Sequence, residues 1–172
     1  MNFLVTQGKI SDAESMLDLM YSCKDDLDRE GLNSFFTLPY WEQFKRIKAM
    51  LRGNVFIIKD NGKIIATLSE SIIDSRMFDE YWSYETYFYP DHYASFGSFL
   101  VAKEYRRKGM AKKLMDHAER EVSKRGIGVI KALINKGNHV SIQVAKDLGF
   151  KKIGRGRVLG KYKCLFFEKE LI

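Results

Sequence analysis

Residues 98–111 give the clearest indication of the fold and read Ser98-Phe99-Leu100-Val101-Ala102-Lys103-Glu104-Tyr105-Arg106-Arg107-Lys108-Gly109-Met110-Ala111. The apolar beginning predicts a strand that ends near Val101, and a charged linker follows. From Met110 onward, apolar residues recur at helical spacing, which predicts a long amphipathic helix. The residues on this stripe are Met110, Ala111, Leu114, Met115, Ala118 and Val122. The chain is therefore expected to form a strand, a basic turn and a helix in succession.

The basic turn has the features of an anion site. The first amide groups of a helix have no acceptor within the helix, and the helix dipole is positive at that end, so a phosphate group can be held by backbone N–H groups. Gly109 has no side chain to block close approach, and Ala111 keeps the next turn narrow. Three consecutive cations add positive charge, and arginine adds a planar fork that suits phosphate oxygens. We therefore expect a phosphorylated ligand at this turn.

The spacing of these residues excludes two common phosphate motifs and resembles a third. The sequence contains neither the P-loop pattern G-x-x-x-x-G-K-[ST] nor the dinucleotide pattern G-x-G-x-x-G. The pattern R-R-x-G-x-A that ends at Ala111 resembles the acyl-CoA motif of the GCN5-related N-acetyltransferase (GNAT) family, [QR]-x-x-G-x-[GA]. Downstream, Asn138, Ser141 and the run Leu148-Gly149-Phe150 match the places of the N-x-x-A and L-G-F features of that family. The resemblance is clear from about residue 94 to residue 172.

The resemblance implies an α/β (α+β) fold formed by one domain over residues 1–172. The expected architecture is a mixed, mostly antiparallel sheet of six or seven strands, flanked by about four helices. It also implies acetyl-CoA as the cofactor, with the pantetheine arm paired to backbone groups of Leu100 and Val101 and the diphosphate wrapped by the following turn. Asn138 would contact pantetheine or order the loop beneath it; a helix cap is at least equally favoured and is compatible with that role. The cofactor residues implied in the turn are Arg106, Arg107, Lys108, Gly109, Met110 and Ala111.

The catalytic groups are less well marked than the cofactor site. A backbone N–H of Leu100 or Val101 would stabilise the oxyanion. Many family members carry a tyrosine three residues before the Leu of L-G-F as general acid, but Ala145 stands there. A glutamate is common on the strand before the basic turn, whereas this chain has Gly97 and Ser98. The possible substitutes are Glu85, His92 and Tyr162; we take Glu85 as the candidate catalytic residue, against the alternative of a salt bridge or an exposed carboxylate.

The function implied is an acetyl-CoA-dependent N-acetyltransferase that moves an acetyl group to a primary amine of a small molecule or protein. The two departures from the catalytic pattern leave an alternative from another class, a non-catalytic module that binds or senses acyl-CoA. Two widely spaced cysteines, Cys23 and Cys164, indicate a reduced, cytoplasmic setting. No secretory leader and no membrane-spanning stretch is visible, so no membrane association is expected.

Charge is distributed unevenly along the 172 residues. The net charge is +7, but residues 1–102 hold 10 Lys and Arg against 15 Asp and Glu, while residues 103–157 hold 16 against 5. The second segment therefore carries +11 and points to an anionic partner. Nucleic acid is not expected, because no aromatic platform is interleaved with the cations. The acidic first segment, at −5, favours an amine-bearing acceptor.

The remaining segments give local expectations. Residues 11–14 predict a capping box at the start of a helix. Pro39 predicts the start of a second helix, with Trp41, Phe44, Ile47, Met50 and Leu51 facing inward. Asp60-Asn61-Gly62 predicts a hairpin turn. Residues 154–160 are interpreted as a flexible bend with Arg155 and Arg157 exposed. No metal site is expected, because His92, His117 and His139 lack ligand spacing.

An aromatic stretch over residues 78–93 is expected to serve core or interface packing. The alternative for Tyr81, Trp82 and Tyr84 is the lining of an acceptor pocket. Exposed aromatics in this stretch are also compatible with a homodimer.

Overall fold

The computed structural model describes residues 3–29, 37–74, 92–158 and 162–171. Its strands form a seven-stranded sheet in the order β1-β2-β3-β4-β5-β7-β6, in which the β4–β5 ladder is parallel and the β1–β2, β2–β3, β5–β7 and β6–β7 ladders are antiparallel. The strands are β1 (Val5–Gln7), β2 (Asn54–Asp60), β3 (Lys63–Asp74), β4 (His92–Val101), β5 (Val129–Asn135), β6 (Lys151–Val158) and β7 (Tyr162–Glu170). The α-helices in the described ranges are α1 (Ala13–Ser22), α2 (Lys24–Arg29), α4 (Tyr40–Met50), α5 (Met110–Lys124) and α6 (His139–Asp147). The fold class expected from the sequence is confirmed.

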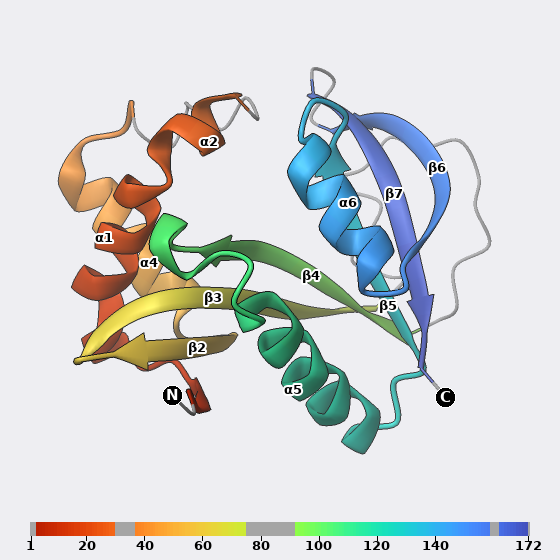
Figure 1. Ribbon diagram of the computed structural model, residues 1–172, viewed down its shortest axis with the longest axis horizontal. Helices are drawn as coiled ribbons and strands as arrows, with labels where there is room; N and C mark the ends of the chain where they lie inside the picture. Colours follow the sequence, from red (N-terminus) through yellow and green to blue (C-terminus); the bar gives the residue numbers. More distant parts are fainter. Residues whose placement is uncertain (1–2, 30–36, 75–91, 159–161, 172) are drawn as a thin grey trace. The chain divides into compact units, whose positions relative to one another are not determined.

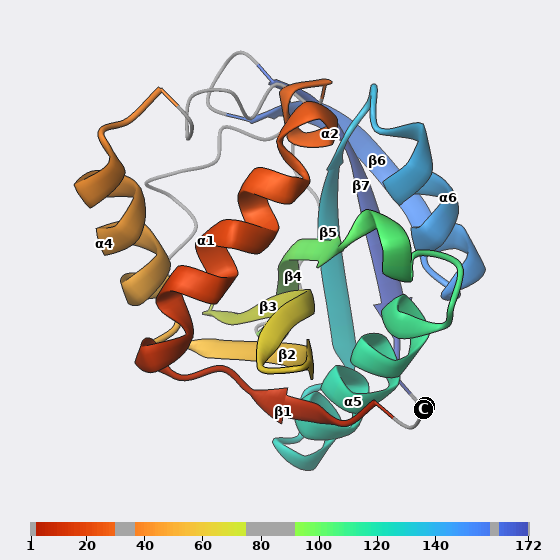
Figure 2. The same ribbon diagram turned by 60° about the vertical axis from the view of Figure 1, so that its left-hand side comes forward.

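The chain divides into two compact units (Figures 1 and 2). The first comprises residues 1–70 and 98–118, and the second comprises residues 71–97 and 119–172. Strand β4 and helix α5 contribute residues to both units. The expectation of a single domain over the whole chain stays a prediction.

In the first unit, β1, β2 and β3 form an antiparallel sheet. The hairpin between β2 and β3 turns at Asn61 and Gly62, which both have positive φ, so the turn predicted from Asn-Gly is confirmed. Helices α1 and α4 pack side by side on one side of these strands, and the beginning of α5 lies on the other (Figure 1). Phe56 of β2 contacts His117 of α5 edge to face, with 5.1 Å between ring centroids. The buried faces of β2 and β3 therefore form the core of this unit.

Helix α4 begins after Pro39 as predicted, but the inward face expected for it was partly wrong. Ile47 and Leu51 are buried, whereas Trp41 is 65% exposed. Gln43, instead of Trp41, faces inward in the first turns of the helix and is 2% exposed. Its side chain accepts a hydrogen bond from the Tyr21 hydroxyl (2.8 Å) and donates one to the Leu38 carbonyl (2.8 Å). Both the carbonyl and the NH2 group of this side-chain amide are hydrogen-bonded. The cost of removing the amide from water is therefore compensated, and Gln43 can be buried.

The capping box predicted over residues 11–14 was also wrong. A 3-10 turn (η1, Ile10–Asp12) precedes α1, and the carboxylate of Asp12 accepts a hydrogen bond from the backbone N–H of Lys9 (2.9 Å). The same carboxylate pairs with the ammonium of Lys59 on β2 at 2.5 Å. Asp12, rather than Ser11, therefore fixes the start of the helical region, and Lys59, which is distant in sequence, holds the Asp12 carboxylate in place.

Helix α5 follows the predicted stripe except at Ala111, which is only half-buried. Met110, Leu114, Met115, Ala118 and Val122 are buried, each with 4% or less of its surface exposed. Lys112 and Asp116 pair across one turn on the exposed face. The amphipathic pattern that predicted this helix therefore also predicts which face it buries.

In the second unit, β4 and β5 run parallel, and β7 lies between β5 and β6. The parallel ladder joins Ala94, Ser95 and Phe96 to residues 130–132. Helix α6 is followed by a chain reversal at Gly149, whose φ is +87°. There the Phe150 N–H bonds to the Ala145 carbonyl and the Gly149 N–H to the Lys146 carbonyl, the Schellman arrangement that ends a helix. The run Leu148-Gly149-Phe150 is therefore a helix terminator.

The flexible bend expected over residues 154–160 was wrong for its first part. Residues up to 158 belong to strand β6, which pairs with β7 from Lys151 to Val158 with an irregularity between Lys152 and Gly154. Arg155 and Arg157 are exposed, as expected. The glycines at 154 and 156 lie within this strand because β7 pairs with it on both sides of them. Residues 159–161 lie outside the described part of the chain.

Candidate functional site

Strand β4 changes its backbone geometry just before the basic turn. Ser98 has a φ of +45°, an uncommon value for a residue other than glycine and typical of a bulge. After the bulge the chain is extended, and the N–H of Ala102 donates to the Ile65 carbonyl of β3 at 2.8 Å. Because hydrogen-bonding groups alternate between the two edges of a strand, Leu100 shares this β3-facing edge. The N–H and C=O groups of Phe99 and Val101 therefore point to the opposite edge.

The connection between β4 and α5 consists of a 3-10 segment (η3, Lys103–Tyr105) and residues 106–109. We call residues 106–111, which include the first two residues of α5, the basic turn. Two of its residues have positive φ, Arg107 at +57° and Gly109 at +81°. Within the described ranges, the amide N–H groups from Arg107 to Met110 have no acceptor, whereas the carbonyl of Gly109 accepts the N–H of Lys113 as the helix begins. A Cβ at Gly109 would meet no atom within 4 Å. The turn thus presents several backbone donors beside open space, the geometry that binds anions.

The three cations of the basic turn have different surroundings. Arg107 and Lys108 are exposed, and the Lys108 ammonium lies over the ring of Tyr105, 5.4 Å from its centroid. The hydroxyl of Tyr105 in turn donates to the carboxylate of Asp60 at 2.5 Å, and this hydrogen bond raises the pKa of Tyr105 above its ordinary value of 10.0. Arg107 and Lys108 are therefore the cations of the turn that face solvent.

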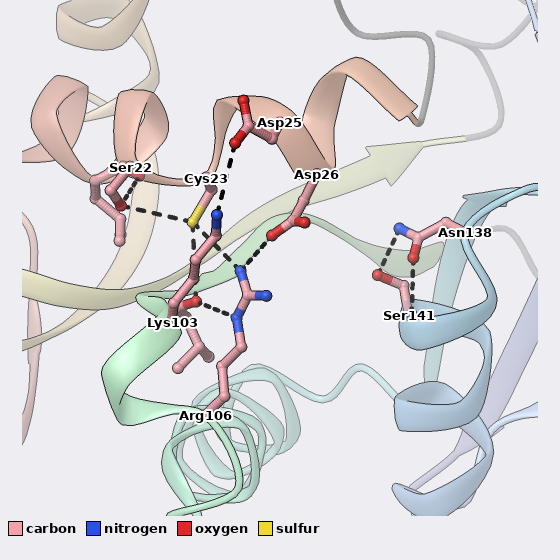
Figure 3. A network of polar contacts seen from close by, with 10 residues as sticks. Ser22, Cys23, Asp25, Asp26, Lys103, Arg106, Asn138 and Ser141 are labelled. Carbon is pink, nitrogen blue, oxygen red and sulfur yellow. Dashed lines mark hydrogen bonds and ion pairs between the residues drawn. The ribbon is translucent and has the colours of Figure 1, made fainter.

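Arg106 instead turns back toward the strand it follows (Figure 3). Its Nε donates to the Val101 carbonyl at 3.0 Å, and its Nη2 donates to Asp26 Oδ2 at 2.7 Å. The Cys23 sulfur lies 3.8 Å from the same Nη2 and 3.8 Å from the Val101 oxygen. Burial by itself would lower the pKa of Arg106, but the hydrogen bond and the charge of Asp26 outweigh it and raise the pKa. This arginine is a fixed cation within a polar network.

Asn138 belongs to the second unit and forms the N-cap of α6. Its Oδ1 accepts the Ser141 N–H at 2.9 Å, and its Nδ2 donates to the Ser141 hydroxyl at 2.7 Å (Figure 3). The residue is 9% exposed. The helix-cap alternative weighed from the sequence is therefore confirmed. Since an amide nitrogen carries two N–H groups, the contact with Ser141 uses only one of them.

The positions that often carry catalytic groups are apolar or small here. Ala145 is 7% exposed, and its side chain has no group that can donate a proton. Gly97 and Ser98 are exposed at the bulge. Glu85 and the aromatic residues Tyr81, Trp82 and Tyr84 lie outside the described residues, as do the side chains of His92 and Tyr162. The sequence-predicted catalytic residue thus stays a prediction.

Two residues of the site were not identified from the sequence. Asp26 is one of several acids near residue 25, and nothing local marks it as the partner of an arginine 80 positions away. Phe99 lies beside Leu100, and its role depends on which edge of β4 faces β3. Once Ala102 is known to face β3, counting back along β4 places Leu100 on the same edge and Phe99 on the opposite one.

Among the described residues, no three His, Cys, Asp or Glu side chains gather closely enough to hold a metal ion. No helix in the described ranges has both the length and the apolar content needed to cross a bilayer.

Among the comparisons with known proteins, one identifies a family and another shows the fold. The family model described as "Acetyltransferase (GNAT) family" matches residues 20–150. A search of curated proteins finds no match. Several solved structures share the fold at low sequence identity.

An acetyltransferase of the GNAT family from Staphylococcus aureus Mu50 superposes with a TM-score of 0.71 at 17% identity, covering 99% of this chain and 100% of its own. The ribosomal-protein-S18-alanine N-acetyltransferase of Escherichia coli gives 0.69 at 15%, covering 99% and 94%. The protein yncA of Salmonella typhimurium, whose structure includes its cofactor acetyl-CoA, gives 0.66 at 18%, covering 100% and 95%.

Proposed function

Since this chain belongs to the acetyltransferase (GNAT) family, we propose that it binds acetyl-CoA at the basic turn and transfers the acetyl group to a primary amine of a small molecule or protein. The observation that carries the proposal is the run of amide donors from Arg107 to Met110, which have no acceptor in the described ranges and lie beside open space at Gly109. These groups suit a diphosphate, because it offers several oxygens to a convergent set of N–H donors.

The strand before the turn suits the rest of such a cofactor. Pairing of an extended pantetheine arm needs N–H and C=O groups on an edge that is not already bonded to β3. Phe99 and Val101 lie on that edge, so we assign the pairing with the pantetheine arm to Phe99, in place of Leu100, and the contact with the thioester to Val101. The Val101 carbonyl already accepts from Arg106, which leaves the Val101 N–H as the donor toward an oxyanion.

The chemistry follows from what each group can do. The bound cofactor supplies the thioester. We assign to the Val101 N–H the stabilisation of the negative charge that develops on the carbonyl oxygen when an amine attacks. Ala145 cannot protonate a departing thiolate, so that proton comes from another group or from water. Positioning of the two reactants supplies much of the rate.

The acceptor proposal rests on charge. The segment of residues 1–102 carries −5, and such a surface attracts a cationic amine before it loses its proton. We propose Glu85, a carboxylate in the aromatic stretch of residues 78–93, as the group that receives this proton. Replacement of Glu85 by Gln should lower turnover and leave the affinity for CoA unchanged.

The test has two steps. Calorimetric titration of the wild-type protein with acetyl-CoA should show one saturable site per chain, and absence of binding would contradict the proposal. A panel of primary amines, including peptides with free N-termini and lysines, should then release free thiol from acetyl-CoA with at least one member.

The second candidate is a module that binds acyl-CoA without turnover. It is favoured by the buried methyl group at Ala145 and by Gly97 and Ser98, where acidic or phenolic groups are absent. Binding of acetyl-CoA with no thiol release across the whole panel would support this candidate over the transferase.

A further inference from the structure

The peptide group that joins Val101 to Ala102 is held at both ends. Its N–H donates to the Ile65 carbonyl at 2.8 Å, and its C=O accepts from Arg106 Nε at 3.0 Å. This peptide is the last of β4, immediately before the 3-10 segment and the basic turn. Its orientation therefore determines how the strand edge and the turn amides lie with respect to each other.

One of these two bonds depends on a side chain from another element. The guanidinium of Arg106 can donate to the Val101 carbonyl only while its plane is held near the strand. Asp26, in the first turn of α2, holds the opposite side of the plane through a charge-assisted hydrogen bond of 2.7 Å. The chain of contacts thus runs from Asp26 through Arg106 to the Val101 carbonyl (Figure 3).

The environment favours a strong contact. The side chains of Arg106 and Asp26 are 36% and 25% exposed, so solvent screens the pair only in part. The neighbouring ion pair of the same helix turn is looser, because Asp25 Oδ2 lies 3.8 Å from the Lys103 ammonium and the Asp25 side chain is 77% exposed. Two adjacent aspartates therefore contact the same segment with different strength.

We propose that Asp26 is a positioning residue for acetyl transfer. Acting through Arg106, it fixes the orientation of the Val101–Ala102 peptide. That peptide determines how two places lie relative to each other, namely the strand edge of Phe99 and Val101 and the amide donors of the basic turn. We call this relative position the register. This inference rests on the proposed function, because the register matters only when one ligand spans both places.

For a ligand that contacts both the strand edge and the turn amides, a change of register affects its two ends differently. The diphosphate is held by the turn amides whether or not the strand edge shifts, whereas the thioester lies at the other end of the bridge. A displacement of about 1 Å at a reacting centre costs up to roughly a hundredfold in rate. Loss of Asp26 should therefore lower kcat more than it weakens CoA binding.

The experiment compares Asp26→Asn with Asp25→Asn, which removes the same charge one residue away. We expect Asp26→Asn to lower kcat by about tenfold, with the Kd for CoA changed by less than about threefold, and to speed hydrogen exchange of the Ala102 amide in NMR spectra. Asp25→Asn should match the wild type in all three measurements. Asp26→Glu should recover part of kcat, since it retains the acceptor for Arg106.

The outcomes separate this inference from the proposed function. A wild-type protein that fails to bind CoA, or binds it without releasing thiol, contradicts the transferase and the positioning role together. An active wild type in which both aspartate variants behave alike overturns the positioning role only. Tighter CoA binding by Asp26→Asn would also overturn it, because Asp26 would then compete with the ligand for Arg106.

Discussion

At Gly109 the backbone adopts a φ of +81°, which is unfavourable for other residues, and a side chain added there would extend into open space beside the amide donors. We predict that Gly109→Glu weakens CoA binding at least about a hundredfold, because a carboxylate would lie among the amide donors and repel a diphosphate. Calorimetry with CoA measures the loss.

The control for this substitution is Gly126→Glu. Gly126 lies beyond the other end of α5 with a φ of +75°, and a Cβ at this position would likewise meet no atom within 4 Å. The backbone strain of about 1–2 kcal/mol and the added charge are the same in both variants. Equal loss of CoA affinity in the two variants would show that the turn is not the binding site.

Asp12 provides a residue-scale prediction about pH. Burial alone would raise its pKa, but the ion pair with Lys59 and the Lys9 N–H hold the pKa below its ordinary value of 3.8. A depressed folded-state pKa means that the stabilisation is present above pH 3.8 and is lost as the pH falls further. Asp12→Asn should therefore cost about 1–2 kcal/mol at pH 7.

Chemical denaturation at several pH values tests this prediction. The difference between wild type and Asp12→Asn should shrink as the pH falls below about 3.8, toward the lower folded-state pKa. Asp18→Asn on the exposed face of α1 is the control and should change stability little at any pH. A pH-independent difference would rule out the charge of Asp12 as its source.

At the scale of the element, the start of α6 depends on Asn138. Removal of an N-cap side chain costs about 1 kcal/mol, so Asn138→Ala should lower the free energy of unfolding by that amount. Asn138→Asp should retain the stability, because a carboxylate also accepts the Ser141 N–H and is favoured at a helix N-terminus. If both variants were equally unstable, the cap would not be the source of the effect.

Helix α4 offers a second prediction at this scale, since its exposed and buried faces differ from the pattern expected for its aromatics. Ile47→Ala should destabilise the protein by about 2–4 kcal/mol, because it removes methyl groups from a site that is 2% exposed. Trp41→Ala should change stability by less than about 0.5 kcal/mol. Thermal unfolding of the two variants distinguishes these faces, and the reverse order of effects would contradict the structure.

At the scale of the whole molecule, the charge of +11 over residues 103–157 includes the exposed Arg107 and Lys108. We predict that the Kd for acetyl-CoA rises about three- to tenfold between roughly 50 mM and 500 mM salt, because salt screens exposed charges beyond a Debye length of roughly 4–14 Å over this range. Replacement of both cations by Gln should flatten this dependence. A Kd that does not change with salt would mean that these cations do not contact the ligand.

Features that depend on neighbours within a few residues could be predicted from the amino-acid sequence alone. The stripe from Met110 to Val122 is local, so helix α5 and its buried face were predictable. The Asn-Gly hairpin was predictable for the same reason, because it depends on a conformational preference of two adjacent residues. The family motif added the fold class, with its mixed, mostly antiparallel sheet of six or seven strands.

Features that join distant segments required the folded chain. Arg106 was expected to serve a phosphate, and its contact with Asp26 spans 80 residues. The buried Gln43 depends on Tyr21, and the cap at Lys9 depends on an aspartate that also binds Lys59. Strand β6 continues through Gly154 and Gly156 because β7 pairs with it. The physical reason is common to all of them: the free energy of a polar contact or a strand ladder depends on a partner that local periodicity does not specify.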